Sequence, residues 1–123
     1  MSYEFYKLLH VLGILLLFVA LGGVTLHAWN GGTKEGNQGR TAAAAMHGLG
    51  LFLILLAGFG MLARLGFVKG GLPGWALAKI VVWLVAGGIL FVPYRRPRSA
   101  RMLYLLLPLL GLVAASLALF KPF

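Results

Sequence analysis

Three histidines and one lysine are the side chains that could carry chemistry within the apolar parts of this chain. His10 and His27 lie near the two ends of a first apolar run, His47 lies near the start of a second, and Lys79 lies in a third. Ionisable side chains are costly inside a bilayer and are candidates for function by default. Neutral imidazole is a good iron ligand, and haem iron can be held by axial histidines. These residue types therefore favour a haem or metal site.

Composition excludes most other catalytic chemistry. The 123 residues include no cysteine, so thiolate nucleophiles, thiolate metal sites and disulfides are absent. Glu4 and Glu35 are the only acidic side chains, and neither lies inside an apolar run. A pair of carboxylates for acid–base work or a Ser-His-Asp set therefore cannot be built within the runs. We expect no independent catalytic activity.

Four apolar runs account for most of the sequence. Hydrophobic residues make up 61% of the chain and the mean hydropathy is +0.96, which is more apolar surface than a soluble domain of this size can bury. Each run can cross a bilayer core, which needs about 20 apolar residues. We predict an all-α fold, an integral membrane four-helix bundle of up-down-up-down topology, as one domain over 1–123. The predicted spans are 6–29, 41–67, 73–92 and 102–120, with a loop over 93–101.

Basic residues flank these runs and give a net charge of +9. Cations at the ends of apolar runs suit anionic lipid headgroups, so we expect a bilayer as the partner and not nucleic acid. The first run is longer than the apolar region of a cleaved signal peptide, and Glu4 precedes it, which favours a retained helix. The arginine-rich third loop predicts a multi-pass protein of a bacterial inner membrane with periplasmic termini. On this topology the terminal side carries Lys7, Arg64, Lys69, Lys79 and Lys121, and the opposite side carries Lys34, Arg40, Arg95, Arg96, Arg98 and Arg101.

Small residues recur on one face of each of the first two runs. The first lane comprises Gly13, Leu16, Ala20, Gly23 and His27, and the second lane comprises His47, Gly50, Ile54, Gly58 and Met61. Small side chains let two membrane helices approach closely. If the two lanes face each other, His27 and His47 meet beside a glycine-lined gap with room for a flat macrocycle. The lanes thus predict haem b with His27 and His47 as the iron ligands.

Simpler roles remain open for each of these side chains. An interfacial histidine can bond headgroups, water or a neighbouring carbonyl, and an interfacial lysine can extend to the headgroups. Lys79 can instead bind an anion such as a haem propionate or a lipid phosphate. Because Glu4 is the one acidic side chain on the terminal side, we expect Lys79 to point to that side, near Lys7 and His10. The lanes can equally serve packing within the bundle or between copies.

The segment Lys7-Leu8-Leu9-His10, followed by a glycine-containing apolar run, resembles the opening of a loose group of small bacterial multi-span proteins. The group includes the HemJ-type protoporphyrinogen oxidases, the CopD-like copper-resistance membrane domains and the SirB-like family. In the HemJ type, a Trp followed a few residues later by Lys opens a later span, as Trp75 and Lys79 do here. The resemblance implies a four-helix or similar bundle with His10 and Lys79 as haem or porphyrin contacts.

Two functions of different classes are consistent with these residues. The first is b-type haem binding for electron transfer or haem handling, with His10, His27, His47 and Lys79 as cofactor contacts. The second is a non-catalytic accessory subunit or assembly factor of a larger membrane complex. In that case the lanes dock other membrane subunits or a second copy of the chain. A transporter is a third interpretation, which the short chain without a charge at the midplane disfavours.

Overall fold

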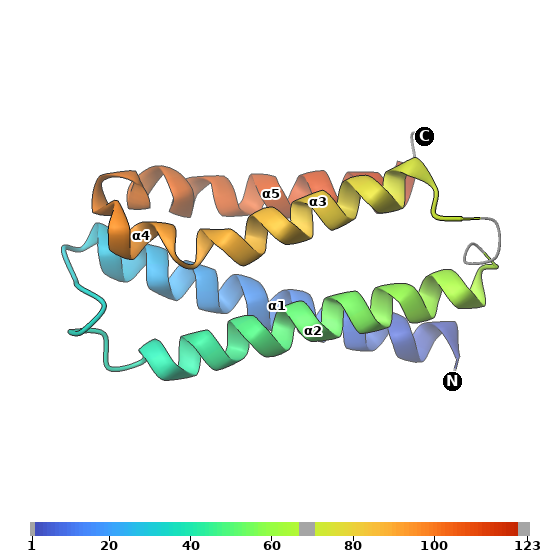
Figure 1. Ribbon diagram of the computed structural model, residues 1–123, viewed down its shortest axis with the longest axis horizontal. Helices are drawn as coiled ribbons and strands as arrows, with labels where there is room; N and C mark the ends of the chain where they lie inside the picture. Colours follow the sequence, from blue (N-terminus) through green and yellow to red (C-terminus); the bar gives the residue numbers. More distant parts are fainter. Residues whose placement is uncertain (1, 67–70, 121–123) are drawn as a thin grey trace.

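Helices account for most of the described chain (Figure 1). The computed structural model describes residues 2–66 and 71–120, and no strand occurs among them. In chain order the helices are α1 (Tyr3–Trp29), α2 (Arg40–Arg64), α3 (Gly74–Ile89), α4 (Val92–Arg95), the 3-10 helix η1 (Pro97–Ser99) and α5 (Ala100–Phe120). The predicted all-α class is confirmed.

Among the described residues, four stretches are long and apolar enough to cross a membrane. They are Tyr3–Trp29, Arg40–Arg64, Gly74–Arg95 and Pro97–Phe120. Large apolar side chains such as Leu15, Val19 and Leu112 point outward and are exposed. A soluble protein rarely exposes so much contiguous apolar surface, whereas a lipid-facing surface requires it. The architecture is therefore that of a multi-pass membrane protein.

The observed helix ends differ from the predicted spans. α1 begins at Tyr3 and not at residue 6, because the Ser2 hydroxyl accepts a hydrogen bond of 3.2 Å from the Phe5 amide and caps the helix. α2 begins at Arg40, one residue before the predicted start. α5 begins at Ala100, two residues before its predicted start. The predicted end of the second span at residue 67 lies outside the described residues, as do Lys69 and Lys121.

The third apolar run is not one continuous helix. α3 begins one residue after Pro73 and ends at Ile89, while α4 and η1 occupy most of the segment 93–101 that we expected to be a loop. Pro93 is tolerated in the first turn of α4, because the missing N–H has no helical partner there. At the break, the Phe91 amide donates to the Gly88 carbonyl at 3.2 Å. This turn bond keeps a backbone amide paired where the helix is interrupted.

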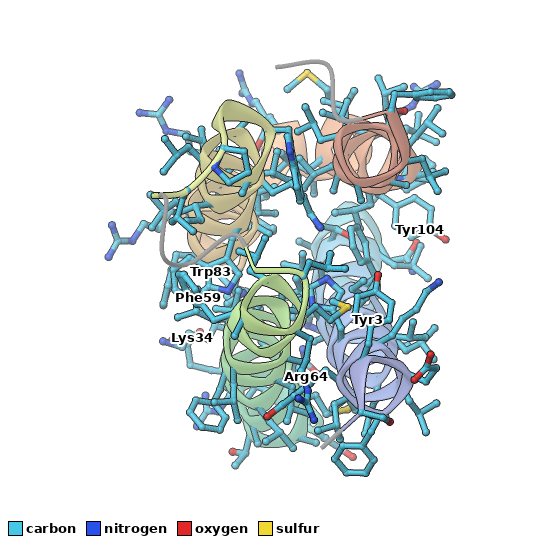
Figure 2. All side chains as sticks on the ribbon, turned by 90° about the vertical axis from the view of Figure 1, so that its right-hand side faces the viewer. Tyr3, Lys34, Phe59, Arg64, Trp83 and Tyr104 are labelled. Atoms are coloured by element: carbon cyan, nitrogen blue, oxygen red, sulfur yellow. The ribbon has the colours of Figure 1, made fainter. Side chains whose placement is uncertain are left out.

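The four long helices form a square when viewed along the bundle (Figure 2). α1 neighbours α2 and α5, and α3 neighbours the same two helices. α1 begins and α5 ends at the same end of the bundle, and the connection between α1 and α2 lies at the other end (Figure 1). α1 supplies half of the buried core cluster, which consists of Leu17, Leu21, Val24, Ala86, Leu90 and Leu107.

The two small-residue lanes face each other where α1 crosses α2, but no gap separates them. A Cβ atom added at Gly50 would lie 2.7 Å from the Gly13 carbonyl oxygen and 2.8 Å from the Leu17 amide nitrogen. A Cβ added at Gly13 would lie 2.8 Å from the Gly50 carbonyl oxygen. The expectation of a glycine-lined gap is wrong at this crossing. Because Gly13 and Gly50 have no side chains, the two backbones contact each other directly.

This contact predicts that Gly50→Ala destabilises the bundle. The new methyl group meets backbone atoms that cannot rotate away, and such overpacking costs roughly 1–3 kcal/mol. Gly48→Ala is the matched control on the same helix, because nothing lies within 4 Å of a Cβ at Gly48. Thermal unfolding of the two variants in detergent, followed by circular dichroism, should show a lower midpoint for Gly50→Ala only. Equal midpoints would contradict the close backbone contact.

Candidate functional site

His47 is buried between α2 and α3, with 5% of its surface exposed. Its Nε2–H donates to the Ala86 carbonyl of α3 at 3.1 Å, because a carbonyl oxygen can only accept. One turn further along α2, the Leu51 carbonyl accepts a hydrogen bond of 2.9 Å from the Trp83 indole N–H. These two bonds, one in each direction, join α2 to α3. In this role His47 fits the simpler alternative of a histidine bonded to a carbonyl.

His27 turns back onto the loop that follows α1. Its Nε2–H donates to the Thr33 carbonyl at 2.8 Å, and its ring occupies the space where a Cβ atom at Gly32 would lie. The structure thus gives His27 and His47 separate partners on different segments. Among residues 2–66 and 71–120, no three His, Asp or Glu side chains gather as a metal site. Iron ligation by His27 and His47 stays a prediction.

His10 lies between α1 and α2, one turn from the glycine crossing. Its Nδ1–H donates to the Ile54 carbonyl of α2 at 3.0 Å. The ring packs against Gly58, where an added Cβ would make an ordinary contact of 3.6 Å with the His10 Cε1 atom. Because Nδ1 carries the proton in this arrangement, Nε2 of the neutral ring keeps its lone pair.

His10 lines a cavity of about 320 Å³ at the end of the bundle where α1 begins. All four long helices contribute to its walls, which are mainly apolar. The polar and aromatic side chains in these walls that matter here are Tyr3, Lys7, His10, Trp75, Lys79 and Trp83. None of the described residues that line the cavity is acidic. Figure 2 looks onto this end of the bundle, with Tyr3 and Trp83 on opposite sides of it.

Lys79 lies where the sequence predicted, on the terminal side with Lys7 and His10. Its side chain is half-buried. These three residues line one cavity, and their placement in one leaflet stays a prediction. Sequence reasoning missed Trp83 as a member of the same wall. The spacing of Trp75, Lys79 and Trp83 by four residues is the signal that could have found it, because residues four apart share one face of a helix.

Comparisons with known proteins found no match among family models, curated proteins or solved structures. The resemblance of the Lys7–His10 segment to the HemJ-type, CopD-like and SirB-like group therefore stays a prediction. The fold alone defines the class, a helical protein with four candidate membrane spans.

His47 is buried and His27 is half-buried, so replacing each by alanine should lower the unfolding free energy by different amounts. His47→Ala leaves a cavity between α2 and α3 and removes one bond that joins them, so we expect a loss of about 2 kcal/mol or more in unfolding free energy. His27→Ala removes a half-buried ring and one bond to a loop carbonyl, and should cost about 1 kcal/mol or less. Unfolding of both variants in mixed detergents measures the difference. The reverse order would contradict the packing described.

Proposed function

We propose that this protein is a small multi-pass protein of a bacterial inner membrane that binds b-type haem in the cavity lined by His10. The observation that carries the proposal is the hydrogen bond of 3.0 Å from His10 Nδ1 to the Ile54 carbonyl. Histidines that bind metals almost always donate their other ring N–H to a carbonyl, a carboxylate or water. That bond fixes the tautomer and the orientation of the ring. His10 therefore has the support that an axial ligand needs.

The other residues of this cavity suit the remaining parts of a haem. Lys7 and Lys79 are cations in the cavity wall, where haem propionates would need partners. Trp75, Trp83 and the aliphatic walls present an apolar surface for a macrocycle. The volume of about 320 Å³ falls within the range of small-molecule sites. When bound, a haem supplies one-electron chemistry at its iron, which suits electron transfer or haem handling.

We choose His10 over the other two histidines because its carbonyl bond leaves Nε2 available for the iron. His27 and His47 use Nε2, the nitrogen farther from the main chain, to bond carbonyls. Their remaining lone pair is on Nδ1, the ring nitrogen nearer the main chain. The helix crossing at Gly13 and Gly50 also has no room for a macrocycle. A site at His10 therefore replaces the gap between the lanes as the place for the cofactor.

A visible spectrum of the full-length protein, purified in detergent after expression with ample haem, tests this proposal. We expect a Soret band that sharpens on reduction. His10→Leu should abolish the band, while His27→Leu and His47→Leu, the matched controls, should keep it. Lys79→Met, which removes a charge but keeps the length of the side chain, should weaken haem retention while the helix content stays unchanged.

Three results would contradict haem binding at His10. A colourless wild-type protein would exclude haem as the ligand. Loss of the band in His27→Leu or His47→Leu but not in His10→Leu would return the site to the two lanes. Retention of the band in every single variant would show that no one of these histidines is required.

An accessory subunit or assembly factor remains a second candidate function, which the outward face of α2 favours. Ala44 and Gly48 are exposed, and nothing lies within 4 Å of a Cβ atom built at Gly48. Small residues four apart let another membrane helix approach closely. Either another membrane subunit or a second copy of the chain would fit this face.

The proposed orientation places the arginine cluster in the cytoplasm and both termini in the periplasm. Arg95, Arg96, Arg98 and Arg101 all lie at or near the ends of α4, η1 and α5, and each is exposed. The positive-inside rule favours retention of such a cluster on the cytoplasmic side. A reporter fused after Phe123 should therefore read as periplasmic, as should one fused before Met1. A cytoplasmic signal from both fusions would reverse the orientation and leave the bundle unchanged.

A further inference from the structure

A second cavity, of about 280 Å³, lies at the opposite end of the bundle from His10. It is formed where the loop after α1, the start of α2 and the segment between α3 and α4 come together. Its walls combine cations, hydroxyl groups and apolar side chains. The residues that matter to its chemistry are Lys34, Arg40, Thr41, Leu90, Phe91 and Tyr94. This combination is amphipathic, with charge on one part and hydrocarbon on the other.

Both cations of this cavity line its wall, and the Arg40 side chain is bonded to the main chain of Lys34. The Arg40 Nη1 group donates to the main-chain carbonyl of Lys34 at 3.4 Å, which fixes the start of α2 against the loop. No acidic residue is among the described residues that line the cavity. Glu35, the nearest carboxylate along the sequence, is exposed, and within the described ranges it forms no ion pair with Lys34 or Arg40. The protein thus gathers positive charge here without balancing it.

Two hydroxyl groups and the start of α2 also belong to the wall of this cavity. The Tyr94 hydroxyl oxygen accepts a hydrogen bond of 2.9 Å from the Asn37 side-chain amide, so its own O–H proton is directed elsewhere. The Thr41 hydroxyl lies in the cavity wall. α2 is 25 residues long, and its N-cap residue Gly39 makes no side-chain capping bond. The positive end of the helix dipole therefore adds to the charge of the two cations.

These positive groups suit an anionic ligand. The apolar part of the cavity indicates which kind of anion fits. Leu90 is 8% exposed and forms the inner wall, whereas Phe91 is 59% exposed and extends the apolar surface outward. A free inorganic anion gains nothing from this surface. An anion attached to hydrocarbon chains gains contact with both parts of the wall.

We propose that this cavity binds the phosphate headgroup of an anionic phospholipid. Arg40 supplies a planar fork of donors that matches phosphate oxygens, and Lys34 supplies a second positive charge. The hydroxyl groups of Thr41 and Tyr94 complete the donor set, and the acyl chains follow Phe91 toward the membrane interior. The cavity shares no residue with the haem site proposed above, so the two proposals stand independently.

Lipid binding to the full-length protein in neutral detergent tests this proposal. Native mass spectrometry during titration gives the Kd for phosphatidylglycerol, for phosphatidylcholine and for inorganic phosphate. We expect phosphatidylglycerol to bind more tightly than either of the others. Arg40→Gln should raise its Kd roughly tenfold, the effect of losing one charge-assisted hydrogen bond. Lys34→Gln, at an exposed loop position, supplies the same comparison if Arg40→Gln fails to fold.

Arg98→Gln is the matched control, because Arg98 lies on the same side of the bundle and is exposed but does not line the cavity. It removes the same charge and should change the Kd by less than about twofold, as expected for a single exposed charge. Equal effects of Arg98→Gln and Arg40→Gln would overturn the site in favour of general attraction to a basic surface. Equal affinity for phosphatidylcholine would overturn the headgroup assignment. Equal affinity for inorganic phosphate would make the site one for a soluble anion.

Discussion

The close backbone contact of Gly13 with Gly50 is the constraint on which the other features of this bundle depend. In lipid, helices gain no hydrophobic free energy by associating, so packing and hydrogen bonds must hold them together. The contact fixes the distance between α1 and α2 and the axial register of the two helices. One turn away on each helix, His10 meets the Ile54 carbonyl at hydrogen-bonding distance. Any side chain at either glycine would move both partners of that bond apart.

Several polar side chains within the spans donate hydrogen bonds to main-chain carbonyls. His10, His47 and Trp83 each reach a carbonyl on a neighbouring helix, while the Thr25 hydroxyl bonds the Leu21 carbonyl of its own helix at 2.7 Å. A helical carbonyl already accepts one amide proton, and its second lone pair can accept another. In a bundle with few acidic or amide side chains, this supply of acceptors allows polar groups to be buried without unpaired charge.

The sequence predicted the features that depend on local composition, and it missed those that depend on helix crossing. Span positions follow from runs of apolar residues, and the location of Lys79 follows from its distance to the end of a span. The hydrogen-bond partners of the histidines could not be predicted from the sequence. The spacing of residues along one helix does not give the distance between two helices. The third run was predicted as a single span to residue 92, and Gly74–Arg95 does form one candidate span, but the apolar sequence did not reveal that the helix is interrupted after Ile89. Gly88 and Pro93 flank the interruption, and each of these residue types is tolerated singly in a membrane helix, so neither predicts a break by itself.

The unequal lengths of the helices have a consequence for the surrounding lipid. α1 has 27 residues and extends about 40 Å, while the 16 residues of α3 extend only about 24 Å, at 1.5 Å per residue. A hydrocarbon core is about 30 Å thick, so α3 alone is too short to cross it, and the third span, Gly74–Arg95, needs the break and α4 to do so. α1 is longer than the core, so it must tilt or extend its ends into the headgroup layers. Leu90 and Phe91, which form the break, also line the cavity that contains Lys34 and Arg40. We therefore expect a change in bilayer thickness to act on this end of the third span, where the helix is interrupted, before it acts on the continuous helix α1.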